Sequence, residues 1–130
     1  MPYTIRYLPE HNVFEMRTHG EMKIEEIAAY SPDCMSRPEW NEDCQILGIA
    51  GVEADFSGFT LEGYRTVLIP AMKAARSGKY ADLKEAILVE KDLDVGIIKL
   101  FEMLATDVPS LNTRVFRSRN EALDWLTSDD

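Results

Sequence analysis

A chain of 130 residues, of which 45% are hydrophobic, can bury one core of its own and is short for two domains. Its 23 acidic and 14 basic residues give a formal net charge of −9, which disfavours binding to phosphate backbones and anionic membrane surfaces. No apolar run approaches the roughly 18 residues that span a bilayer, and the N-terminus lacks the features of a signal peptide. We therefore expect one cytoplasmic domain over residues 1–130, with no nucleic-acid partner and no membrane insertion.

The chain opens with a predicted β-hairpin. Residues 3–8 and 13–18 alternate in hydrophobicity and are rich in β-formers, and the intervening Pro-Glu-His-Asn supplies a turn. Val13, Glu15 and Arg17 would share one side of the second strand, and Phe14, Met16 and Thr18 the other. Gly20 is expected to close this strand.

A helix is predicted next, over about Lys23 to Tyr30. Ile24, Ile27 and Ala28 would face inward, because residues three and four apart share a helical face. Pro32 is expected to end the helix, and a loop or broken helix would follow up to Asp43.

The middle of the chain predicts a central strand and a second helix. Residues 46–56 contain the run Ile-Leu-Gly-Ile-Ala-Gly-Val, which suits a strand covered on both faces. Thr60 is placed to cap the following helix, and Pro70 should kink that helix or split it in two. The residues that repeat at three and four along this helix are Leu61, Tyr64, Leu68, Met72 and Ala75.

Another buried strand is predicted at residues 86–89, between Glu85 and Glu90, and a third helix after it, capped by Asp92 or Asp94. This helix is apolar around much of its circumference at residues 95–105. Such a helix either lies deep between the sheet and its neighbours, or offers a surplus face to a second subunit or a ligand. A homodimer is therefore one possibility.

A short strand running into a capped helix closes the chain. Ser118 and Glu121 have the spacing of a capping box, and Ala122, Trp125 and Leu126 share one helical face. The predicted order is β-β-α-β-α-β-α-β-α. It indicates an α/β fold with a mixed, mostly parallel five-stranded sheet, four main helices, and the first strand antiparallel at or near an edge.

The cysteines and histidines form no recognisable metal or redox motif. Cys34 and Cys44 are not spaced as CxxC, so we expect two free thiols in place of a disulfide. His11 and His19 lie outside the patterns HxH and HExxH, so no metal and no cofactor is predicted. A nucleophilic pair of either cysteine with His19 is the alternative.

Polar side chains gather in the loop after the central strand. Asp55, Ser57 and Thr60 place a carboxylate and two hydroxyls beside the N-terminus of the next helix, which carries Arg65. This arrangement suits a bound phosphoryl group or a phosphorylated hydroxyl. The alternative is a plain strand-to-helix turn in which Thr60 is the cap and Asp55 binds nearby amides.

A second candidate site is an apolar pocket between the sheet and the third helix. Trp40, Met72 and Met103 could join its surface, although such residues more often form ordinary core. The residues predicted to line it are Tyr64, Leu68, Ile97, Phe101 and Leu104.

Taken together, these residues resemble the bacterial STAS/SEC14-like group, small proteins similar to anti-sigma-factor antagonists. The resemblance covers nearly the whole chain and implies a compact α/β domain that binds partner proteins; its SEC14-like side implies a lipid-like ligand. The stretches that carry it are residues 52–60, 86–89, 115–116 and 121–126, with Gly20 followed by a helix containing Glu25 and Glu26.

In phosphoswitched antagonists, a serine follows an aspartate and precedes a glycine where the helix after the central strand begins. Here that helix begins at Thr60 without an Asp-Ser-Ser-Gly sequence, and Ser57-Gly58 comes earlier. We therefore expect a non-enzymatic regulatory or protein-interaction module that uses the surface from Asp55 to Arg65 and lacks a clear phosphoswitch serine. The alternative is a carrier of a small lipophilic ligand.

Overall fold

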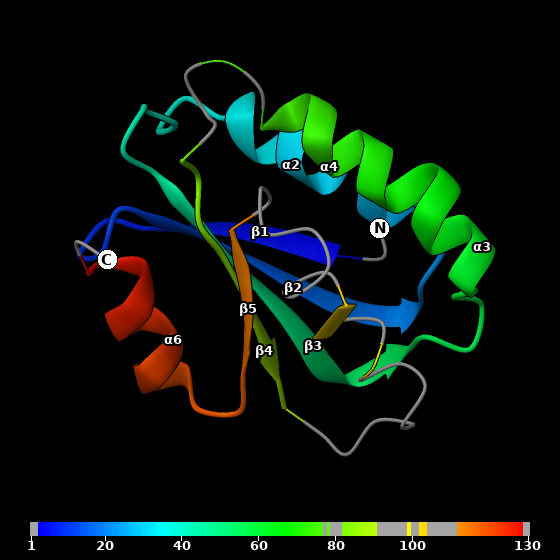
Figure 1. Cartoon of the computed structure of the whole chain (residues 1–130). Coiled ribbons are helices and arrows are strands. Elements are labelled where there is room, and N and C mark those ends of the chain that lie inside the picture. The colour runs from blue at the N-terminus through cyan, green and yellow to red at the C-terminus, as the bar shows by residue number, and fades with distance from the viewer. Residues whose placement is uncertain are drawn as a thin grey trace.

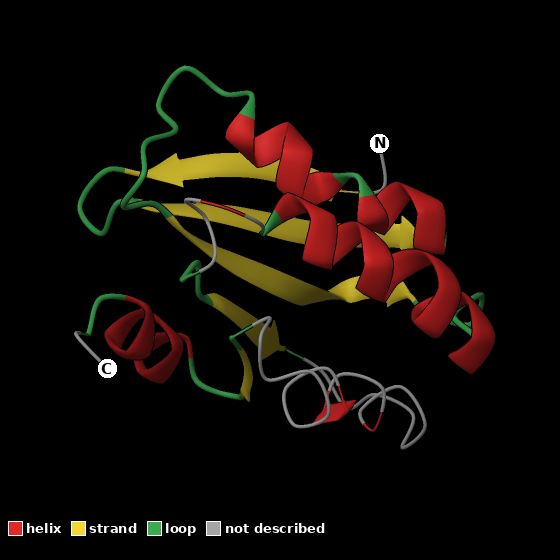
Figure 2. Ribbon diagram, turned by 45° about the horizontal axis from the view of Figure 1, so that its top comes forward, coloured by secondary structure: helices red, strands yellow, loops and turns green. Residues whose placement is uncertain are grey.

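In the computed structural model, a five-stranded sheet carries helices on both faces (Figures 1 and 2). The structure describes residues 3–76, 78, 82–90, 99, 102–103 and 112–128. β1 is antiparallel to β2 and the other neighbouring pairs are parallel, so the predicted mostly parallel α/β sheet with an antiparallel edge strand is confirmed. The strands lie side by side in chain order: β1 (Tyr3–Leu8), β2 (Val13–Glu21), β3 (Gln45–Asp55), β4 (Glu85–Val89) and β5 (Thr113–Phe116).

The central strand β3 is buried on both faces, as its apolar run predicts. Ile46 and Ala50 belong to the core cluster on one side of the sheet, and Leu47 and Ile49 to the cluster on the other. Because successive side chains of a strand point to opposite faces, this run must be covered from both sides. The result is a three-layer molecule with the sheet in the middle.

The two helical layers differ in size. One face carries α1 (Ile24–Ala28), α2 (Tyr30–Met35), and one continuous helical stretch made of α3 (Leu61–Gly63), the π-helical turn η1 (Tyr64–Leu68) and α4 (Ile69–Ala75). The opposite face carries α6 (Arg119–Leu126) (Figure 1). The larger layer covers Phe14, Met16 and Ile46, and α6 covers Val13, Leu47 and Leu88.

Pro32 does not end a helix, and this prediction is wrong. The helix breaks earlier, at Ala29, and Pro32 lies in the first turn of α2. The first amides of a helix have no intrahelical partner, so a proline there loses no hydrogen bond. Of the two forms predicted for the segment up to Asp43, the broken helix is the one observed, with α2 ending at Met35.

Pro70 lies in a continuous helical stretch, just after a turn that is wider than an α-helical turn. The amide of Ile69 donates to the carbonyl of Tyr64, five residues earlier, which defines the wide turn η1 directly before the proline. Pro70 is the second residue of α4, and the widened turn accommodates its ring and its missing amide. Leu61, predicted to face inward, is 43% exposed because it lies in the first turn of this helix, at the edge of the molecule (Figure 1).

The predicted third helix, with Ile97, Phe101 and Leu104, lies largely outside the described residues. Lys99, Glu102 and Met103 are helical, and Met103 packs half-buried against the larger core cluster. The predicted count of four main helices therefore stays a prediction.

The C-terminal helix begins and ends on specific polar contacts. The amide of Glu121 donates to the hydroxyl of Ser118 at 3.4 Å, which is the predicted N-terminal cap. At the other end, the Lys84 ammonium group donates to the carbonyls of Trp125 (3.0 Å) and Ser128 (2.9 Å). A cation at a helix C-terminus satisfies free carbonyls and opposes the helix dipole. Lys84 thus ties α6 to the base of β4.

Candidate functional site

A cavity of about 50 Å³ lies between the sheet and the larger helical layer, and it is open on one side. Its floor is formed by β2, β3 and β4, and its roof by the helices. Most of its wall is apolar, contributed by Met16, Ile27, Phe56, Phe59, Leu68 and Met72. A water molecule needs roughly 10–15 Å³ of such space, so the cavity holds a few non-hydrogen atoms.

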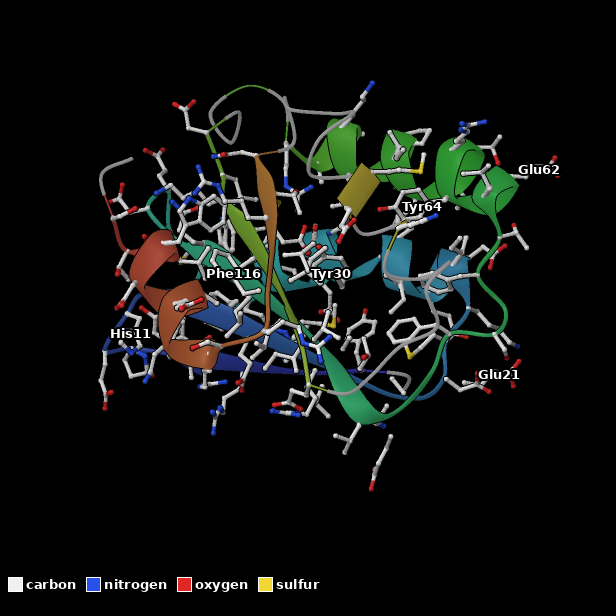
Figure 3. The ribbon with its side chains drawn as sticks, turned by 60° about the horizontal axis from the view of Figure 1, so that its bottom comes forward. His11, Glu21, Tyr30, Glu62, Tyr64 and Phe116 are labelled. Atoms are coloured by element: carbon white, nitrogen blue, oxygen red, sulfur yellow. The ribbon has the colours of Figure 1, made fainter. Side chains whose placement is uncertain are left out.

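Two tyrosines line this cavity, and their hydroxyl oxygens are buried without a hydrogen-bond partner in the described structure. Tyr30, from α2, is 2% exposed, and Tyr64, from η1, is 0% exposed. Both belong to the core cluster under the larger helical layer, whereas Phe116 packs against the cluster under α6 (Figure 3 labels the three residues). Burial of Tyr64 raises the pKa of its hydroxyl, which therefore stays protonated and able to donate. Buried hydroxyls are normally paired, because leaving one unpaired costs about 1–3 kcal/mol.

A buried ion pair borders the same cavity. Glu85, the first residue of β4, lines the cavity and is paired with the guanidinium of Arg76, which follows α4. Their side chains are only 4% and 1% exposed. Burial raises the pKa of Glu85 to about 8 and lowers that of Arg76 to about 10, because both charges have lost their water. The contact runs through Nη2 of Arg76, and its Nε and Nη1 atoms are buried without a partner in the described structure.

The cavity coincides in part with the predicted pocket. Tyr64 and Leu68 line it, whereas Ile97, Phe101 and Leu104 are outside the described residues. The sequence prediction missed Tyr30 and Glu85. In the sequence, Glu85 is recognisable only as a charged residue next to a buried strand. The pairing register of β4 shows that it lies inside the sheet, between Ile46 and Thr113.

The loop after β3 is organised as a strand-to-helix turn. The amide of Ser57 donates to the Asp55 carboxylate at 2.9 Å, and the amide of Gly63 donates to the Thr60 hydroxyl at 3.0 Å. Asp55, Ser57, Thr60 and Arg65 are all exposed. The predicted turn and cap are therefore confirmed, and these four side chains lie at the surface.

A shallow groove of about 160 Å³ runs beside this loop. Gly58, Thr60 and Gly63 form one side of it. The other side runs from the end of β2 into the start of α1 and includes Glu21 and Glu25 (Figure 3 labels Glu21). The groove lies next to the carboxyl ends of β2 and β3, which is where ligands commonly bind in parallel sheets.

Cys34 and Cys44 are free and buried, as predicted. Burial raises the pKa of Cys34 to about 12 and also raises that of Cys44. Both are protonated at neutral pH, and a thiol lacks the nucleophilicity of a thiolate. Within the described ranges, no cluster of three or more His, Cys, Asp or Glu side chains is arranged to hold a metal ion.

Searches of protein-family models, of curated proteins and of solved structures each gave no match to this chain. None of the helices that the structure describes combines the length and apolar character that crossing a membrane requires.

Removing the hydroxyl of Tyr64 is expected to stabilise the ligand-free protein. Tyr64→Phe deletes an unpaired buried polar group and keeps the ring, so the free energy of unfolding should rise by about 1 kcal/mol. Tyr7→Phe is the matched control, because the Tyr7 hydroxyl donates to Asn12 at 2.7 Å and its loss should destabilise the fold. Urea unfolding of the three proteins measures both changes. A decrease in stability of Tyr64→Phe would show that its hydroxyl has a partner.

The ion pair predicts strong non-additivity. Arg76→Met or Glu85→Gln alone should lower the free energy of unfolding by about 3–5 kcal/mol, because one buried charge loses its compensation. The double variant should lose less than the sum of the two single losses. Urea unfolding of the four proteins gives the coupling energy. Additive losses would mean that the two side chains do not stabilise each other.

Proposed function

We propose that this protein binds a small, mainly apolar molecule in the cavity between the sheet and the larger helical layer, and that it acts by binding and not by catalysis. The observation that carries this proposal is the cavity itself, whose mainly apolar wall includes Tyr30 and Tyr64, two side chains with buried hydroxyls that have no partner among the described residues. In an otherwise apolar wall, such groups are destabilising unless something fills the space and pairs with them.

The volume of the cavity limits the size of the molecule that it can bind. A volume of about 50 Å³ does not enclose a whole lipid, so the bound molecule is small or enters with one end only. The opening lets the remainder of a longer molecule extend outward. The sequence suggests a carrier of a lipophilic ligand, and the volume of the cavity restricts that ligand to a compact apolar group.

Native mass spectrometry of the protein purified from its own cells tests the proposal. A bound molecule should appear as a mass shift that disappears on denaturation. Ala50→Leu, which fills the cavity from β3, should reduce the bound fraction at least tenfold, whereas Val52→Leu on the same strand should not. Val52 is 63% exposed and lies outside the cavity wall, so it is the matched control. Equal binding by both variants, or a native protein without bound molecules, contradicts the proposal.

A second candidate function is the regulatory or protein-interaction module expected from the STAS/SEC14-like resemblance, which stays a prediction. The groove beside Thr60 is the observation that favours it, because this groove adjoins the surface from Asp55 to Arg65. Leu61, an exposed apolar side chain, follows Thr60 directly. A phosphate on Thr60 would add negative charge beside Glu21 and Glu25, and would change what this surface binds.

Phosphopeptide mapping of the native protein tests this second candidate. We expect phosphate on Ser57 or Thr60, and its loss in the combined Ser57→Ala and Thr60→Asn variant. Asparagine keeps the helix cap, so the fold is preserved. Ser36→Ala, which changes another exposed serine, is the control. Absence of phosphate from residues 53–65 of the native protein contradicts a phosphoswitch here.

A further inference from the structure

We propose that a groove between the β1–β2 turn and α6 binds a small organic molecule through a single carboxylate, which Arg6 and Arg119 hold. Both arginines line this groove, together with residues of the turn and Leu123 of α6. The groove lies on the α6 side of the sheet, opposite the cavity, so this inference goes beyond the function proposed above and does not depend on it.

Two arginines meet at one buried carboxylate beside the groove. Arg6 on β1 and Glu15 on β2 are direct neighbours in the antiparallel pair, and Arg119 is the first residue of α6. Arg6 contacts one oxygen of Glu15 at 3.0 Å, and Arg119 contacts the other oxygen at 2.5 Å. The Glu15 side chain is only 8% exposed, so an anchor within the fold restricts the position of both guanidinium groups.

Both guanidinium groups have donors to spare. A guanidinium carries five N–H donors, and each arginine contacts Glu15 through one nitrogen. Neither arginine makes another hydrogen bond or ion pair in the described structure. Two positive side chains share one negative side chain, so the three together carry a surplus positive charge. Their remaining N–H groups can therefore bind an added anion.

The groove has the volume and the lining of a site for a small molecule. Its volume is about 430 Å³, and pockets for small ligands typically enclose about 300–1,000 Å³. Leu8, Pro9 and Leu123 supply apolar surface, and His11 belongs to the turn (Figure 3 labels His11). A ligand with an apolar group for these side chains and a carboxylate for the arginines matches both parts of the lining.

The charge of the site favours a carboxylate over a phosphate. A carboxylate balances the surplus charge, and its two oxygens match the planar fork of a guanidinium. A phosphate monoester carries about −1.5 to −2 at neutral pH and would leave negative charge beside Glu10, which also lines the groove. The negative net charge of the chain acts at longer range, and physiological salt screens it beyond about 8 Å.

Benzoate, benzamide and phenyl phosphate test this assignment, because they share a phenyl ring and differ in charge. In protein labelled with ¹³C at the leucine methyl groups, benzoate should shift the signals of Leu8 and Leu123. The signal of Leu68, which lies in the cavity wall, should stay unchanged. We expect benzoate to bind about tenfold more tightly than benzamide, and more tightly than phenyl phosphate.

Single substitutions separate the two arginines from general effects of charge. Arg6→Gln and Arg119→Gln should each weaken benzoate about tenfold, and in each variant Glu15 retains one arginine. Arg17→Gln is the matched control, because it removes the same charge from β2 outside the groove lining and should leave benzoate binding unchanged. Glu10→Gln should strengthen benzoate about twofold, because it removes an opposing charge. Glu10 is exposed, so this variant tests the site even if an arginine variant does not fold.

Each contrary result identifies what is wrong. If benzoate shifts neither Leu8 nor Leu123, or shifts Leu68 alone, the groove is not the binding site. Equal binding of benzamide and benzoate would show that the ring is recognised without the arginines, and would overturn the inference. Tighter binding of phenyl phosphate than of benzoate would refute the carboxylate. An equal loss of benzoate binding in Arg17→Gln and Arg119→Gln would show an effect of overall charge and no specific site.

Discussion

The need to cover β3 on both faces is the constraint on which the rest of this structure depends. A parallel strand whose side chains are apolar on both sides is stable only between two layers, and here the layers are unequal. On one side, among the described residues, α6 packs against Leu47 and Ile49, and Lys84 binds the carbonyls at the end of α6. On the other side, several short helices cover the sheet (Figure 2). The cavity lies between these helices and the sheet.

Polar groups buried under this layer set the chemistry of the site. Arg76 and Glu85 form a buried pair where α4 ends and β4 begins, and the Nε and Nη1 atoms of Arg76 have no hydrogen-bond partner in the described structure. The hydroxyls of Tyr30 and Tyr64 likewise have no hydrogen-bond partner among the described residues. Proteins keep few such groups, and those that they keep are usually tied to function.

The sequence predicts much of the fold and only part of this site. Alternation and apolar runs are local signals, so the five strands and the caps at Thr60 and Ser118 follow from them. The break at Ala29 and the turn η1 are not predicted by these signals. Tyr64 and Leu68 are predictable as the inner face of a helix. The pairing of Glu85 with Arg76 is not, because it depends on the register of β4.

The sheet is also assembled in the order in which the ribosome makes it. Each new strand adds beside the one synthesised before it, from β1 at one edge to β5 at the other. No strand lies between two strands that precede it in the sequence, so the sheet can form without threading a segment between elements already in place. At every stage of synthesis one growing edge is exposed, and the next segment of the nascent chain is the strand that covers it.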